Sequence, residues 1–103
     1  MTHAPDIRFI GMEACGALAS VARDRAEALD RTYRGIMSCQ VAFALARPRP
    51  GRAGAYSVRL DLLTDSGDAL RAQGADATSF YGALRDAFET TGRRLRDNAH
   101  RLQ

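Results

Sequence analysis

The chain has few of the residue types from which catalytic and metal sites are built. Its 103 residues include two histidines and two cysteines, and there is no lysine. His3 and His100 stand near opposite ends, and Cys15 and Cys39 form neither a CxxC motif nor a Cys/His pair with metal-ligand spacing. No nucleophile motif is present, and no paired carboxylates border an apolar cleft. We therefore expect a non-enzymatic protein with no metal, no cofactor and no small-molecule substrate.

Long apolar runs are also missing, so we predict no segment that crosses a membrane. No signal peptide precedes the cysteines, which we interpret as reduced thiols of a cytoplasmic protein. Hydrophobic residues make up 46% and charged residues 26% of the chain, as in ordinary soluble globular proteins. The length fits a single domain over residues 1–103, with its core at about residues 6–102.

All fifteen basic residues are arginine. This bias is typical of codon usage, but it has a physical consequence, because arginine is always charged and presents a planar fork of donors that suits phosphate. Twelve acidic residues reduce the formal net charge to +3. That charge permits an acidic partner without requiring one.

Hydrophobic periodicity predicts six elements in the order β-α-β-β-β-α. A helix runs from about Leu18 to Gly35, and a second helix follows Ser79, which we predict as its N-cap. Strands are predicted at residues 6–11, 36–46, 55–64 and 68–74. Prolines and glycines mark a loop at 47–54, and "DSG" at 65–67 marks a tight turn.

Each predicted helix has one apolar stripe. These positions are Leu18, Ala22, Ala26, Leu29 and Tyr33 in the first helix, and Tyr81, Leu84, Phe88, Thr91 and Leu95 in the second. The strand at 36–46 has one apolar face, made of Met37, Cys39, Val41, Phe43 and Leu45. The simplest packing places both helices on one face of a four-stranded sheet, which makes an α+β fold. The other face stays open and polar, with Arg8, Gln40, Ser57 and Arg59 but no aromatic pair for base stacking.

The arginines are the residues that point to a function. The candidates are Arg23 and Arg25 in the first helix, Arg47, Arg49 and Arg52 in the loop, and Arg85, Arg93, Arg94, Arg96, His100 and Arg101 in the last helix. Local acids are placed to neutralise some arginines, as in the i,i+4 pairs Glu89–Arg93, Asp97–Arg101 and Asp30–Arg34. Arg85, Arg94 and Arg96 lack such a partner. Charge alone leaves two readings open, a solvated helix face and a surface that binds nucleic acid.

The order of elements, together with several short segments, resembles the ribosome hibernation-promoting factor family, also called ribosome-associated inhibitor A or sigma-factor modulation proteins. The segments are "IRFIGME" (7–13), "VARDRAEALDR" (21–31), "IMSCQVAF" (36–43), "GAYSVRLDL" (54–62) and "SFYGALRDAFETTGRRL" (79–95). The resemblance implies a β-α-β-β-β-α fold related to double-stranded RNA-binding domains. It also implies binding to the small ribosomal subunit and its 16S rRNA in the mRNA/tRNA channel, with repression of translation in stress or stationary phase.

The resemblance further implies roles for individual positions. Arg23 and Arg25 match basic sites of the first helix, and Arg85, Arg93, His100 and Arg101 match basic sites of the second. The loop arginines resemble a basic hairpin in one branch of the family. Ala28, Thr90 and Asp97 stand where some members are basic, and this departure motivates a second hypothesis, a protein-interaction module that has lost strong rRNA binding. A weak homodimer through the exposed edge of the last strand is a third hypothesis.

Overall fold

The computed structural model describes residues 1, 3–46 and 55–101, without the side chains of residues 46, 55 and 99–101. These residues form six elements in the predicted order. They are β1 (Asp6–Ile10), α1 (Gly16–Thr32), β2 (Ile36–Ala46), β3 (Ala55–Thr64), β4 (Ala69–Asp76) and α2 (Phe80–Arg101). The α+β fold is therefore confirmed.

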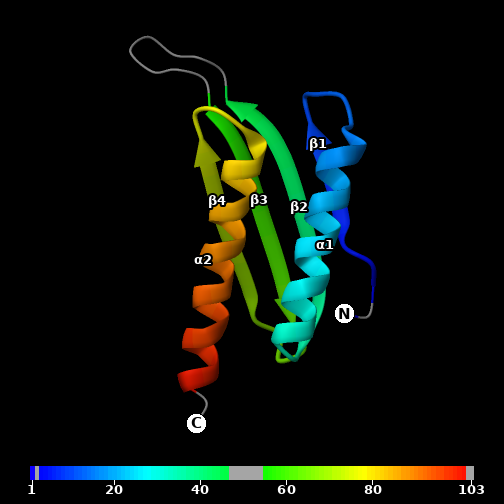
Figure 1. Ribbon diagram of the computed structural model, residues 1–103. Coiled ribbons are helices and arrows are strands. Elements are labelled where there is room, and N and C mark those ends of the chain that lie inside the picture. The colour runs from blue at the N-terminus through cyan, green and yellow to red at the C-terminus, as the bar shows by residue number, and fades with distance from the viewer. Residues whose placement is uncertain (2, 47–54, 102–103) are drawn as a thin grey trace.

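The four strands form one mixed sheet in the order β1-β2-β3-β4. β1 pairs with β2 in parallel, and the pairs β2–β3 and β3–β4 are antiparallel, as expected for a meander. Figure 1 shows both helices on the same face of the sheet, running in the same direction. α1 packs on β1 and β2, and α2 packs on β3 and β4. The opposite face of the sheet carries no helix among the described residues.

The core lies between the helices and the sheet, and aromatic rings join its elements. Phe43 of β2 is fully buried, stacks on Phe9 of β1 at 5.0 Å, and meets the edge of Phe80 of α2 at 5.5 Å. Tyr56 of β3 also packs edge-on against Phe80, at 4.9 Å. Such pairs add about 0.5–1.5 kcal/mol each beyond the apolar area they bury. One cluster of rings therefore holds three strands and α2 together.

Small residues let α2 lie directly on β4. A Cβ atom built on Gly74 would be 2.0 Å from the carbonyl oxygen of Ala83 and 2.7 Å from the backbone nitrogen of Ala87. Both alanines are fully buried. No side chain fits between these backbones, so Gly74 sets the distance between α2 and the sheet.

Two predicted core positions are wrong by one residue, and a third is exposed. Met37 is 40% exposed while Ile36 is buried, because a register shift after Ile36 changes which side chains face the helices. Tyr81 is 51% exposed and Phe80 is buried instead, since α2 begins at Phe80 and directs that ring into the core. Leu45, the next-to-last residue of β2, is also exposed.

The two helices differ in how their N-termini are capped, and the predicted cap at Ser79 is confirmed. Ser79 accepts a hydrogen bond through Oγ from the backbone N–H of Gly82, at 3.2 Å, and so caps α2. Cys15 precedes α1 and makes no side-chain cap hydrogen bond. α2 therefore has the better-defined start of the two helices.

Candidate nucleic-acid interface

The arginines on the open face of the sheet each lie against a neighbouring carboxylate. Arg8 Nε lies 2.9 Å from Asp6 Oδ2. Asp61 receives two arginines, with Arg71 Nε at 2.6 Å and Arg59 Nε at 3.3 Å. Exposed pairs of this kind add little stability, but they cancel the local charge. The donors of these arginines are therefore engaged by carboxylates, and one positive charge remains where Arg59 and Arg71 share Asp61.

The exposed arginines of the helices are arranged differently. Apart from Arg94, the predicted rRNA-binding arginines of the helices with described side chains are Arg23 and Arg25 on α1 and Arg85, Arg93 and Arg96 on α2, and all five are exposed. Within the described part of the chain, none of the five forms an ion pair with a carboxylate. Their charge remains available to an external anion.

Two of the predicted local ion pairs are wrong. Arg93 donates through Nη2 to the hydroxyl of Thr90 at 3.3 Å, rather than pairing with Glu89. The carboxylate of Asp30 lies 2.7 Å from the terminal ammonium of Met1 instead of meeting Arg34. An i,i+4 spacing permits an ion pair, but on an exposed helix the gain of about 0.2–0.5 kcal/mol does not dictate one side-chain conformation.

Arg94 is already engaged inside the molecule. Its guanidinium donates through Nη1 to the backbone carbonyl of Arg71 on β4. β4 is an edge strand, so this contact covers part of the unpaired backbone at that edge. The sequence predicts an Arg94 that is free for a ligand, and the structure gives it an intramolecular partner instead.

Arg85 lies near the start of α2, where Asp76 organises the turn. Thr78 donates to Asp76 Oδ1 through both its hydroxyl and its backbone N–H, each at 2.7 Å, and Ser79 N–H donates at 3.2 Å. These hydrogen bonds lower the pKa of Asp76, and the positive charge of Arg85 lowers it further. The Asp76 carboxylate is thus committed mainly to the turn.

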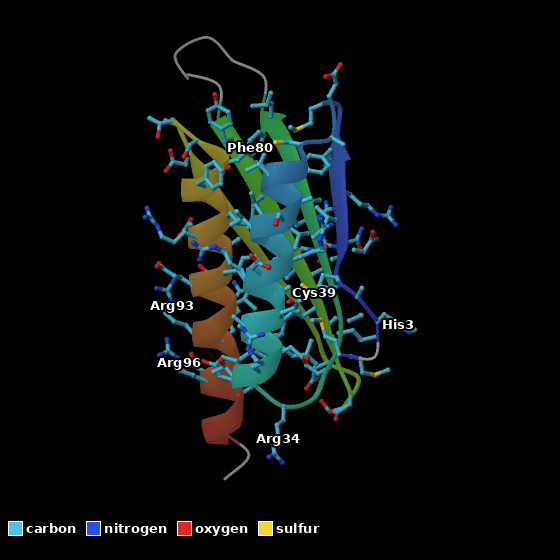
Figure 2. The ribbon with its side chains drawn as sticks, turned by 45° about the vertical axis from the view of Figure 1, so that its right-hand side comes forward. His3, Arg34, Cys39, Phe80, Arg93 and Arg96 are labelled. Atoms are coloured by element: carbon cyan, nitrogen blue, oxygen red, sulfur yellow. The ribbon has the colours of Figure 1, made fainter. Side chains whose placement is uncertain are left out.

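The arginines of α2 form a line along the helix. Arg85 and Arg96 are eleven residues apart, which places them about 20° apart around the axis and about 16 Å apart along it. Arg93 and Arg96 are separated by one turn, and Figure 2 shows them one above the other on the same side of α2. A rigid helix therefore presents several charges at fixed spacing.

Some predicted residues lie outside the described part of the chain. They are Arg47, Arg49 and Arg52 and the side chains of His100 and Arg101. Their proposed role in binding rRNA remains a prediction.

A pocket of about 400 Å³ lies between the end of α1, the β3–β4 turn and α2. Its lining includes Tyr33, Arg34, Asp65, Asp68 and Leu95, and none of the predicted rRNA-binding residues contributes to it. Two carboxylates at its wall make it a poor site for a phosphate. The pocket and the arginine line are separate features.

The cysteines are free thiols. Cys39 is buried, and burial together with the nearby negative charge of Asp61 raises the pKa of its thiol to about 12. The predicted place of Cys39 on the apolar face of its strand is confirmed, and a buried thiol that keeps its proton is a poor nucleophile. In the described ranges, no helix has the length and apolar character needed to cross a membrane.

The comparisons with known proteins agree with this fold. The fold is similar to a ribosomal subunit interface protein from Coxiella burnetii, with a TM-score of 0.73, 13% identity and coverage of 92% of this chain and 96% of that one. It is also similar to the N-terminal domain of Protein Y from Thermus thermophilus, with a TM-score of 0.70, 18% identity and coverage of 87% and 91%. A search of curated protein sequences gave no match.

At these identities the two structures establish the fold alone. The sequence evidence comes from a family model, described as sigma 54 modulation protein / S30EA ribosomal protein, which matches residues 6–103. Since that match covers nearly the whole chain, the chain belongs to the sigma 54 modulation protein / S30EA ribosomal protein family.

Proposed function

We propose that this chain is a non-catalytic protein that binds the small ribosomal subunit, occupies its mRNA/tRNA channel and represses translation in stress or stationary phase. The family match to ribosomal proteins supports this proposal, as do the names of the two similar structures. The partner in this proposal is 16S rRNA, held through its phosphates.

One observation indicates which residues would bind the rRNA. Arginines on the open sheet face have carboxylate partners within 4.0 Å, whereas in the described residues Arg23, Arg25, Arg85, Arg93 and Arg96 on the helices have none. Exposed acids share these helices, but among the described side chains none lies within ion-pair distance of the five guanidinium groups. The guanidinium groups therefore keep donors for phosphate oxygens, and a polyanion that binds them would release its own counterions.

The proposed contacts are charge-assisted hydrogen bonds from guanidinium groups to phosphate oxygens. Such contacts position a protein on RNA without reading its bases. The proposed binding set is Arg23, Arg25, Arg85, Arg93, Arg94, Arg96, His100 and Arg101, with Arg47, Arg49 and Arg52 of the loop. Within it, Arg94 would have to share its guanidinium with the Arg71 carbonyl, so its contribution should be smaller than that of Arg96.

The proposal is tested by co-sedimentation of the protein with purified small ribosomal subunits. Replacing Arg93 and Arg96 together with glutamate should abolish co-sedimentation, because two attractive charges one turn apart on α2 become repulsive. The wild-type protein should also dissociate steeply as salt rises, because binding to phosphates releases counterions from the RNA and added salt opposes that release.

Arg8→Glu is the control, since Arg8 lies on the open sheet face and is paired with Asp6. It removes the same kind of charge but should leave binding nearly unchanged. Co-sedimentation of the double variant at the wild-type level would contradict the proposal. If the wild-type protein fails to bind subunits even at low salt, and instead retains one protein partner in a pull-down, the interaction-module hypothesis is favoured.

A further inference from the structure

Gly92 is a glycine for which the fold gives no reason. It lies in the interior of α2, thirteen residues into a continuous helix of 22 residues. Glycine is a poor helix former because it loses more backbone freedom than any other residue on folding. A glycine in such a position therefore lowers the stability of α2 relative to alanine.

The other glycines that pack along β4 and α2 have structural reasons. A Cβ atom on Gly74 would collide with the backbone of Ala83, and one on Gly82 would be 2.0 Å from Asp76 Oδ2. At Gly92, by contrast, an added Cβ would have no neighbour within 4 Å apart from the adjacent residues and the backbone of its own helix. Alanine would fit there without any change in the protein, so the missing side chain leaves open space on the outside.

That open space lies within the arginine line. Gly92 comes seven residues after Arg85 and four before Arg96, so the three positions fall within about 40° of one another around the helix. Arg93 is the next residue and lies about 100° around the helix from Gly92. Glu89 lies one turn before Gly92, and Asp86 and Asp97 directly follow Arg85 and Arg96, but in the described residues none of these acids forms an ion pair with the three arginines.

We propose that Gly92 forms a notch in α2 at which the sugar–phosphate backbone of rRNA approaches the helix backbone, while Arg85, Arg93 and Arg96 hold the phosphates around it. Glycine is used elsewhere in proteins where a ligand must come close to the main chain. This inference rests on the proposed function, because it requires RNA on this face. It adds a steric requirement for rRNA binding, whereas attraction between charges alone would tolerate a side chain at position 92.

The test is Gly92→Ala, which changes no charge. Thermal unfolding should shift upward by about 2–6 °C, because alanine restricts the unfolded chain and suits the helix. Affinity for purified small ribosomal subunits should fall by about tenfold, since the methyl group occupies the notch. Gly92→Leu should still fold, and its affinity for the subunits should be lower than that of Gly92→Ala.

Gly16→Ala is the matched control. It makes the same change in α1, where an added Cβ also has nothing within 4 Å, but outside the arginine line. Its affinity should equal that of the wild type. Wild-type affinity in Gly92→Ala, or a lowered midpoint of unfolding, would overturn the inference about Gly92 while leaving the proposed function standing. A wild-type protein that does not bind subunits would overturn both.

Discussion

Gly74→Ala should separate α2 from the sheet. The new Cβ would lie 2.0 Å from Ala83 O and 2.7 Å from Ala87 N, whereas real Cβ atoms stay at least about 3.0 Å from such neighbours. Both neighbours are backbone atoms, so no side-chain rotation relieves the collision. The helix or the strand must therefore move by about 1 Å at this point.

The energetic cost follows from what α2 buries. Its large buried side chains are Phe80, Leu84, Phe88 and Leu95. Burying such a side chain contributes about 1.5–3 kcal/mol, and a gap of about 0.5–1 Å removes a quarter to a half of the dispersion attraction. Partial loss over the four side chains gives about 3 kcal/mol, a large part of the roughly 5–15 kcal/mol expected for a domain of this size.

Urea unfolding followed by far-UV circular dichroism measures this cost directly. The midpoint for Gly74→Ala should fall well below that of the wild type, while Gly16→Ala, which has open space for its methyl group, should unfold at or slightly above the wild-type midpoint. A free energy of unfolding for Gly74→Ala within about 0.5 kcal/mol of the wild type would refute the close packing of α2 on β4.

Two further predictions concern Cys39 and Arg94. Burial raises the pKa of the Cys39 thiol from its ordinary value of 9.0 to about 12 in the folded protein. Above pH 9 the unfolded thiol ionises while the buried thiol keeps its proton, so the free energy of unfolding should fall by about 1.4 kcal/mol per pH unit up to about pH 12. Cys39→Ala should lack this slope in pH-dependent urea titrations, and equal slopes would contradict the prediction. Arg94→Ala should cost about 1 kcal/mol through the missing hydrogen bond to the Arg71 carbonyl. It should also increase concentration-dependent self-association in analytical ultracentrifugation, since it uncovers the β4 edge; a monomer of unchanged stability would argue against this role.

The element order was predictable because the core is periodic. Val41, Phe43, Val58 and Leu60 alternate along β2 and β3, and all four are buried. The stripe of α2 was predictable for the same reason. The helical period predicts Tyr81 as the first residue of this buried stripe. The cap at Ser79 instead directs Phe80 into the core. Consecutive side chains on a helix point about 100° apart, so an error of one residue moves the side chain out of the core.

The positions of the candidate rRNA-binding residues on exposed helix faces also followed from the sequence, since both helices have one apolar side. Their freedom from local acids did not follow. Glu89 and Arg93 have the spacing of a pair but do not form one, and Arg94 has no acid at i−4 yet is bound to β4. Exposed side chains have several conformations of similar energy, so spacing along the helix does not choose among them.

The sequence by itself determined the α+β class, the order of the strands and helices, and which helix faces carry arginine, because each depends on a local period of two or 3.6 residues. Only the tertiary structure decided which arginines are neutralised. Asp61 on β3 pairs with Arg71 on the neighbouring strand β4, and Arg94 donates to a carbonyl 23 residues away in the chain. The same holds for the glycines, since the close contact at Gly74 and the open space at Gly92 depend on neighbours that only folding brings near.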